Sequence, residues 1–162
     1  MFKNDETRAL GKLTIEVKDK DGKLKQKEEV TNLVVDTGLA YIASRMKDAS
    51  ATAMSNMAIG TGSSAAAAGN TALGTEAARV ALTSTTVTSN AVAYVASFAA
   101  GTGTGAITEA GILNAGSGGT LLCRTVFSVV NKGASDSMTI TWTVTISSVS
   151  YTHLTLPTNR EV

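Results

Sequence analysis

The 162-residue chain has little of what most enzymes and metal proteins are built from. It contains one histidine, one cysteine and one proline, and aromatic residues make up only 4% of it. The single cysteine, Cys123, excludes a disulfide framework within the chain, and the sequence has no Cys/His cluster with metal-ligand spacing. We therefore expect no metal, no cofactor and no catalytic activity.

Long apolar runs and a strong net charge are also missing. No apolar stretch approaches the roughly 20 residues that cross a bilayer, and the first residues, Met1–Glu6, contain no apolar signal core. The formal net charge is only +1, so electrostatic attraction to nucleic acid or to a membrane surface is weak. We expect a protein that is not exported by a signal peptide and that has neither nucleic acid nor membrane as a partner.

The last residues, Ser148–Val162, resemble translated sequencing-library DNA. From Val149 to Thr158 they read Val-Ser-Tyr-Thr-His-Leu-Thr-Leu-Pro-Thr, which is similar to the translation of a transposase-adapter sequence, and the only histidine and proline fall there. Such segments are set aside in fold reasoning. We expect residues 148–162 to be an artefactual tail on a metagenomic sequence, and residues 1–147 to form one domain, for which their number is ample.

Charge is concentrated at the N-terminus. Residues 1–30 hold eight of the 14 Lys and Arg and seven of the 13 Asp and Glu. Apolar and polar residues alternate over residues 12–18, as in a half-buried strand, and Asp21-Gly22 is a hairpin signal because glycine accepts a positive φ. Lysines alternate along residues 23–30, as on an exposed edge strand. This region is predicted to be a charged hairpin, with Leu13, Ile15 and Val17 facing the core.

One short amphipathic helix is predicted over residues 37–47. Asp36 or Thr37 can cap it by accepting a hydrogen bond from a first-turn N–H group. Its apolar stripe recurs at helical spacing and is expected to face the core. The stripe consists of Leu39, Ile42, Ala43 and Met46.

The remaining chain is rich in Ala, Gly, Ser, Thr and Val, and its alternating patterns predict strands. Strands are expected over 54–59, 80–88, 91–99, 106–114, 120–130 and 138–147, with a brief helix or turn over 71–79. The last strand is the clearest, since threonine occupies one whole face. That face, expected to meet solvent or a partner, consists of Thr139, Thr141, Thr143 and Thr145. The chain is thus predicted to be mainly β, an antiparallel two-layer β-sandwich with one short helix, or a sheet carrying one helix.

No constellation typical of an active site is found. Gly60-Thr61-Gly62 lacks the following lysine and Ser/Thr of a phosphate-binding loop, and the glycine spacing of a dinucleotide-binding fingerprint. Cys123 has no histidine to activate it, which favours a buried structural thiol. The scattered carboxylates form no recognisable acid/base pair. They are Asp36, Glu76, Glu109 and Asp136.

Glu109 and Arg124 interrupt two otherwise apolar strands of a predicted hairpin. With Ala115–Gly118 as a four-residue loop, counting outward places Glu109 opposite Arg124, on a face shared with Ile107 and Val126. A charge on such a face requires a partner, so we expect a structural ion pair. The alternative is that both side chains point to solvent, where such pairs contribute little.

Several stretches in consistent order resemble small tailed-phage virion proteins, in particular the attachment domain of tail fibres and tail-collar fibre proteins. They are Thr31-Asn-Leu-Val-Val-Asp-Thr-Gly-Leu-Ala, Met57-Ala-Ile-Gly-Thr-Gly, Ile107-Thr-Glu-Ala-Gly-Ile-Leu-Asn-Ala, and Gly119-Thr-Leu-Leu-Cys-Arg-Thr-Val-Phe leading into Lys132-Gly-Ala-Ser-Asp-Ser-Met-Thr-Ile-Thr-Trp. The resemblance implies a structural protein of the virion, assembled in the host cytoplasm. The fibre shaft that follows this domain in tail fibres is not seen here, so a head decoration protein stays open.

Two functional classes follow. The first is a non-enzymatic structural component, associated with the tail fibre or baseplate, whose partners are copies of itself and other virion proteins. The second is a module that binds the host surface or a glycan through the small-residue loops at 60–70 and 101–105. In either case self-association or docking is expected through a sheet edge or the threonine face, since the chain after residue 30 carries little charge.

Overall fold

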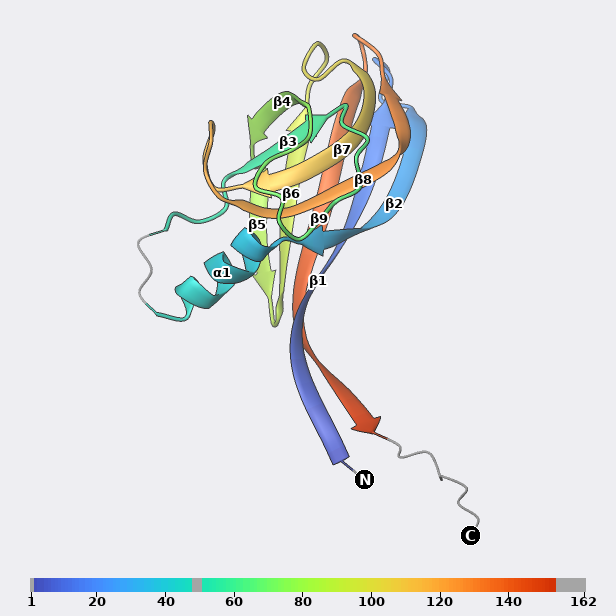
Figure 1. The fold of residues 1–162 in the computed structure, drawn as a ribbon. Helices are drawn as coiled ribbons and strands as arrows, with labels where there is room; N and C mark the ends of the chain where they lie inside the picture. Colours follow the sequence, from blue (N-terminus) through green and yellow to red (C-terminus); the bar gives the residue numbers. More distant parts are fainter. Residues whose placement is uncertain (1, 48–50, 154–162) are drawn as a thin grey trace.

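The computed structural model describes residues 2–47 and 51–153, which form nine β-strands and one α-helix (Figure 1). In chain order they are β1 (Phe2–Lys18), β2 (Leu24–Val34), α1 (Asp36–Arg45), β3 (Asn56–Gly60), β4 (Glu76–Ala81), β5 (Ser84–Thr88), β6 (Ala91–Phe98), β7 (Gly105–Leu113), β8 (Leu121–Lys132) and β9 (Ser137–His153). The prediction of a mainly β fold with one short helix is confirmed.

All nine strands belong to one antiparallel sheet, in the order β4-β3-β7-β8-β2-β1-β9-β6-β5, which curls into a half-barrel. The bend lies where the end of β2 meets β8, through the pairs Leu33 with Arg124 and Val34 with Cys123. Figure 1 shows β7 and β8 crossing over β6 and β9. The predicted sandwich is therefore right in part: two layers enclose the core, but they are two halves of one curled sheet.

The main core fills the space between these halves. It takes the inward-facing side chains of β1, β6 and β9 on one side and of β3, β7 and β8 on the other. Trp142, fully buried, donates its indole N–H to Asn32 Oδ1 at 3.0 Å. Gly11 lies beside this bond, and a Cβ there would overlap the Asn32 side chain. The alternation of β1 and β9 predicted from sequence is confirmed by the buried positions Leu13, Ile15, Val17, Met138, Ile140 and Val144.

The N-terminal hairpin turns at residues 19–23, as predicted. Gly22 has φ +82°, and Asp19 Oδ1 accepts hydrogen bonds from the N–H groups of Asp21 and Lys23, both at 2.9 Å. The return strand β2 is not a simple edge, because its last residues pair with β8. Along the rest of β2, Lys25 and Lys27 are exposed.

Helix α1 differs from its prediction at its start and in its buried face. It begins at Asp36, so the expected caps Asp36 and Thr37 lie inside the helix, and the residue at the N-cap position, Val35, has no side-chain acceptor to cap it. Thr37 Oγ1 donates to the Leu121 carbonyl at 2.8 Å. The predicted apolar stripe is right only at Ile42, which packs against the core, because Leu39 is 47% and Met46 87% exposed and Ala43 is exposed as well. Gly38 and Tyr41 complete the face of the helix that covers the sheet. A Cβ at Gly38 would overlap the Leu122 carbonyl, so only glycine lets the helix approach β8 this closely.

The segment between residues 71 and 88 also departs from expectation. A brief helix or turn was expected over 71–79 and one strand over 80–88. Instead β4 begins at Glu76 and pairs with β3, with Val80 opposite Met57, and a break precedes β5. The pairing with β3, which no local pattern encodes, decides the conformation.

Strand β9 continues past the predicted end of the domain at Ser147. Ser148–His153 pair with Phe2–Thr7 of β1, and the two strands leave the body of the molecule as a two-stranded ribbon (Figure 1). Neither half of this ribbon pairs with a further strand within the described ranges 2–47 and 51–153. The rest of the expected artefactual tail, 154–162, lies outside the described residues. That the tail adds nothing to stability stays a prediction.

Candidate functional site

Glu109 of β7 and Arg124 of β8 form an ion pair inside the protein. Arg124 donates to Glu109 Oε2 from Nε at 2.9 Å, and its Nη2 lies 2.8 Å from the same oxygen, so one edge of the guanidinium contacts one carboxylate oxygen. The side chains are 0% and 2% exposed. The structure thus joins the two residues in the buried geometry expected from sequence rather than the exposed alternative.

The register that led to this expectation is wrong. Glu109 lies opposite Val126 and Arg124 opposite Gly111, so the ion pair is diagonal. The loop spans residues 115–119, one residue longer than assumed, and Leu122 forms a bulge because Leu113 pairs with Leu121 and Ile112 with Cys123. The longer loop and the bulge each shift the register by one residue. Because side chains alternate with period two, the two shifts together return Glu109 and Arg124 to the same face of the sheet.

The shared face was also only partly predicted. A second irregularity lies between Ile107 and Glu109, and Ile107 packs in the main core. Glu109 points away from that core, toward the loop over residues 61–75. The irregularity therefore separates Ile107 from the face that carries the ion pair.

Backbone N–H groups of this loop complete the coordination of Glu109. Gly62 and Thr75 donate to Oε1 at 2.9 and 2.6 Å, and Gly74 donates to Oε2 at 2.8 Å. Arg124 binds the same loop through its acceptors, which are the Ser64 carbonyl at 3.0 Å, the Ala65 carbonyl at 3.4 Å and Asn70 Oδ1 at 2.9 Å. We call this set of contacts the loop anchor. It holds the loop on the sheet from inside.

The glycines of the 60–62 segment are explained by the loop anchor. A Cβ on Gly60 would lie 2.6 Å from Glu109 Oε1, and one on Gly62 would overlap the same atom. The segment does bind an anion through its backbone, by the N–H of Gly62, but the anion is the Glu109 carboxylate of this chain. A phosphate at the same amides would have to displace Glu109.

Hydrogen bonds set the ionisation of Glu109. Burial by itself raises the pKa of this carboxyl group, but the N–H groups of Thr75 and Gly74, the Arg124 guanidinium and the N–H of Gly62 outweigh burial and hold the pKa below its ordinary value. Glu109 is therefore a carboxylate, which suits an anchor and not a proton donor.

A second charged cluster surrounds Asp136, which is 4% exposed. Its Oδ2 accepts from Lys25 Nζ at 2.7 Å and from the Gly133 N–H at 2.8 Å, and the Lys25 bond is the main reason that its pKa is lowered. Burial lowers the pKa of Lys132, whose Nζ donates to the Ala99 carbonyl at 2.9 Å. Sequence reasoning missed this cluster, because Lys25 is 111 residues from Asp136 and only the fold brings them together.

The other residues singled out from sequence are dispersed. Asp36 is exposed in the first turn of α1, and Glu76 pairs with Arg79 at 2.7 Å. Cys123 is fully buried, and burial raises the pKa of its thiol. Within residues 2–47 and 51–153, no three His, Cys, Asp or Glu side chains are grouped so as to hold a metal ion. Helices long and apolar enough to cross a membrane are likewise not found in these ranges.

The predicted threonine face lies on the outside of the half-barrel. Thr139, Thr141, Thr143 and Thr145 of β9 lie opposite Ser97, Val95, Ala93 and Ala91 of β6, and the last three of these lie opposite Ser84, Thr86 and Thr88 of β5. We call these eleven residues the outer face. It is uncharged and built from small side chains, with no side chain larger than valine.

Charged side chains border the outer face on one side only. They belong to β1 and β2, where Lys12 pairs with Glu29 at 3.5 Å and Lys27 with Glu16 at 3.9 Å. All four side chains are at least one-third exposed. The border thus separates an ionic surface from a neutral one on the same sheet.

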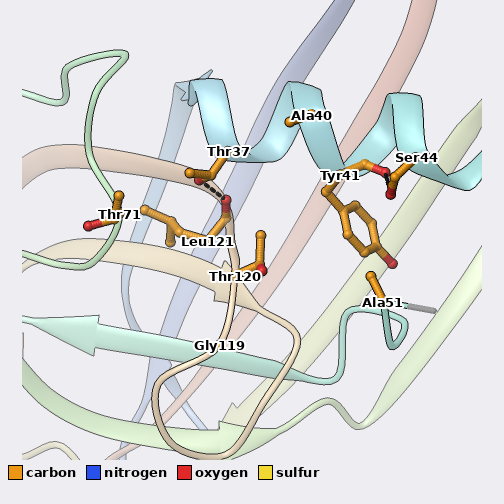
Figure 2. A pocket seen from close by; sticks show the side chains of 9 residues that line it. All are labelled: Thr37, Ala40, Tyr41, Ser44, Ala51, Thr71, Gly119, Thr120 and Leu121. Atoms are coloured by element: carbon orange, nitrogen blue, oxygen red, sulfur yellow. Dashed lines mark hydrogen bonds between the residues drawn. The ribbon is translucent and has the colours of Figure 1, made fainter. Parts of the chain in front are cut away.

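Two hollows flank α1. The first, of about 450 Å³, lies between α1 and the residues that precede β8 (Figure 2). Two of its hydroxyl groups are engaged within the chain, since Thr37 Oγ1 donates to the Leu121 carbonyl and Ser44 Oγ to the Tyr41 carbonyl. The second, of about 340 Å³, is an apolar groove between α1 and the inner face of β5, β6 and β9. Its lining includes Ile42, Met54, Val87, Val92, Tyr94 and Ile146.

The chain matches no protein-family model, no curated protein and no solved structure. Function therefore has to be argued from the residues and the geometry above.

Proposed function

We propose that this chain is a non-enzymatic structural component of a tailed-phage virion, associated with the tail fibre or baseplate, which assembles through β-sheet surfaces. The observation that carries the proposal is the outer face. An uncharged sheet surface of small side chains can lie against another protein without burying an unpaired charge. Eight of its eleven residues come from β6 and β9, whose opposite sides pack in the core, so this part of the surface is held in place before it binds.

The resemblance to tail-fibre attachment proteins supports the same proposal. Its stretches fall on the end of β2 and start of α1, on β3, on β7 and on β8. They supply Gly38, Gly62, Glu109 and Arg124, which hold the helix and the 61–75 loop on the sheet. The residues that carry the resemblance therefore maintain the fold. This is expected of a structural domain that takes part in an assembly and carries out no reaction.

Purified particles provide the test. Phage particles from the source community, purified on a density gradient, should contain peptides of residues 1–147 at a stoichiometry typical of a structural protein. Gold-labelled antibodies against the recombinant chain should then mark the tail. Labelling of the head would assign the decoration role instead, and absence from intact particles would contradict the proposal.

A host-surface or glycan-binding module is the second candidate. The loop anchor favours it, because binding loops work best when a rigid scaffold positions them. In this role the 61–75 loop would contact the ligand through small side chains and backbone groups. Binding of the chain to host cells or to a glycan array, abolished by Ala65→Trp and unaffected by Thr141→Trp on the outer face, would select this function over the first.

A further inference from the structure

The two ends of the curled sheet are protected very differently. At one end, β4 carries Glu76 and Arg79, which pair with each other, and Arg79 also donates to the carbonyls of Ala115 and Gly118 at 2.9 and 2.8 Å. Charged side chains of this kind are a common protection of an edge strand. These charges disfavour the addition of a further strand at this end of the sheet.

The other end, β5, has no such protection. All of its residues, Ser84-Thr-Thr-Val-Thr88, are exposed, and none is charged or a proline. Its register with β6 runs without a bulge, and among the described residues it pairs with no second strand. One side of β5 therefore presents backbone N–H and C=O groups that a further strand can use.

Beside this edge lies an uncovered apolar surface. Val87 is 70% exposed although it points inward, where with Val92 and Ile146 it lines the 340 Å³ groove. An inward-facing valine is left exposed because the sheet ends at β5. A strand added at this edge would cover Val87 and close the side of the groove.

We propose that the strand added here is β5 of a second copy of this chain, paired antiparallel about a two-fold axis at Thr86. The inference rests on the proposed function, since it names the first partner in the assembly. An isologous contact of this kind requires a self-complementary surface. β5 meets the requirement: Thr86 faces Thr86 of the second copy, Ser84 faces Thr88, and Thr85 faces Val87.

The side chains of β5 suit self-pairing better than those of the exposed part of β2. Cross-strand pairs of Ser and Thr stabilise antiparallel sheets, and β5 has no charge that would repel its copy. The exposed part of β2, by contrast, carries Lys25 and Lys27, whose ion pairs with Asp136 and Glu16 a second β2 would have to cover. Pairing through β5 also joins two outer faces into one, because Ser84, Thr86 and Thr88 belong to that face.

Disulfide trapping tests the axis directly. Antiparallel partners have Cα atoms about 4.5 or 5.5 Å apart, within the range of about 4.4–6.8 Å that a disulfide spans. Cys123 is buried, so Thr86→Cys places one accessible thiol on the full chain. Mild oxidation should convert this variant to a covalent dimer. Thr141→Cys, exposed on the outer face away from the edge, is the matched control and should form no covalent dimer under the same oxidation.

Register and specificity are tested by mixing variants. Ser84→Cys or Thr88→Cys alone should cross-link poorly, and an equimolar mixture of the two should cross-link efficiently. In sedimentation velocity the unmodified chain should have twice the mass of Thr86→Lys or of Thr86→Glu, and mixing these two variants should restore the dimer. A charge at Thr141 should leave the dimer intact.

A monomeric full chain, or cross-linking of Thr86→Cys no faster than that of Thr141→Cys, would overturn the inference. A dimer that survives Thr86→Lys would overturn it too, because the contact would then lie elsewhere. These outcomes are separable from failure of the proposed function: the chain can be present in virions without a β5 contact, and a β5 dimer can form in a protein absent from virions.

Discussion

Replacing Arg124 with leucine should lower the free energy of unfolding by about 3 kcal/mol, because it leaves the buried carboxylate of Glu109 without its counter-charge. The three loop N–H groups still bind the carboxylate in this variant. They hold the cost near the lower end of the range of about 3–5 kcal/mol found when a buried pair is broken.

Glu109→Leu should cost more, about 4–5 kcal/mol, because it strands more than a charge. Arg124 loses its partner, and the N–H groups of Gly62, Gly74 and Thr75 lose their acceptor together. Each buried donor left without a partner costs about 1–3 kcal/mol. The loop over residues 61–75 should loosen in this variant, so that water can hydrogen-bond to the freed N–H groups. This limits the loss in the free energy of unfolding.

The double variant Glu109→Leu, Arg124→Leu should be no less stable than Glu109→Leu alone, because the stranded Arg124 charge is gone. It still leaves the loop N–H groups without an acceptor. Its stability therefore stays below that of the unmodified chain, whereas replacing an isolated buried ion pair by leucines can cost little. The resulting coupling is about 3 kcal/mol. Urea unfolding, followed by the fluorescence of the single tryptophan Trp142, measures all three variants.

The control is the exposed pair of Lys12 and Glu29, whose side chains are 63% and 54% exposed. The same double replacement there should give a coupling of less than about 1 kcal/mol. A coupling below about 0.5 kcal/mol for Glu109 and Arg124 would refute the reasoning, since that is the behaviour of a solvated pair.

Three further predictions concern acid, the loop glycines and the ribbon. Because the folded-state pKa of Glu109 is below its ordinary value of 4.5, its stabilisation is fully present above pH 4.5 and is lost as the pH falls through the folded-state pKa. In urea unfolding at a series of acid pH values, the free energy of unfolding should fall less steeply with pH for Glu109→Gln than for the unmodified chain. Equal slopes would contradict the assignment. Gly62→Ala should destabilise by about 1–3 kcal/mol because its Cβ overlaps Glu109, whereas Gly69→Ala, with no heavy atom within 4 Å of its Cβ, is the control and should change stability little. A chain ending at Ser147 should melt within a few degrees of the full chain, since a two-stranded ribbon adds little stability; a larger drop in calorimetry would show that residues 148–162 act as structure.

Local sequence patterns determined much of the fold. Period-two alternation located residues 12–18 of β1, nearly all of β6 and residues 138–147 of β9, and it gave the buried faces in β1 and β9, because side chains of a strand point alternately to its two faces. Asp21-Gly22 located the first turn, because few residue pairs adopt its backbone angles. That Glu109 and Arg124 need each other also followed from sequence, since an isolated charge in an apolar strand is costly.

Other features depended on contacts between distant residues. Pairing with β3 made residues 76–81 a strand, and close approach to Leu122 made Gly38, rather than Leu39, the buried position of α1. The register of β7 and β8 depended on a bulge at Leu122 that no local pattern marks.

Gly60 and Gly62 were visible in the sequence, but the reason that glycine is required there was not. It became apparent only from the tertiary structure, in which β7 brings the Glu109 carboxylate against them. Secondary-structure propensity and polar–apolar alternation depend on residues that are close in the chain, so they can be recognised from the sequence alone. Register, curl and the partner of a buried charge depend on the packing of the whole chain, in which segments 35 to 111 residues apart compete for the same contacts.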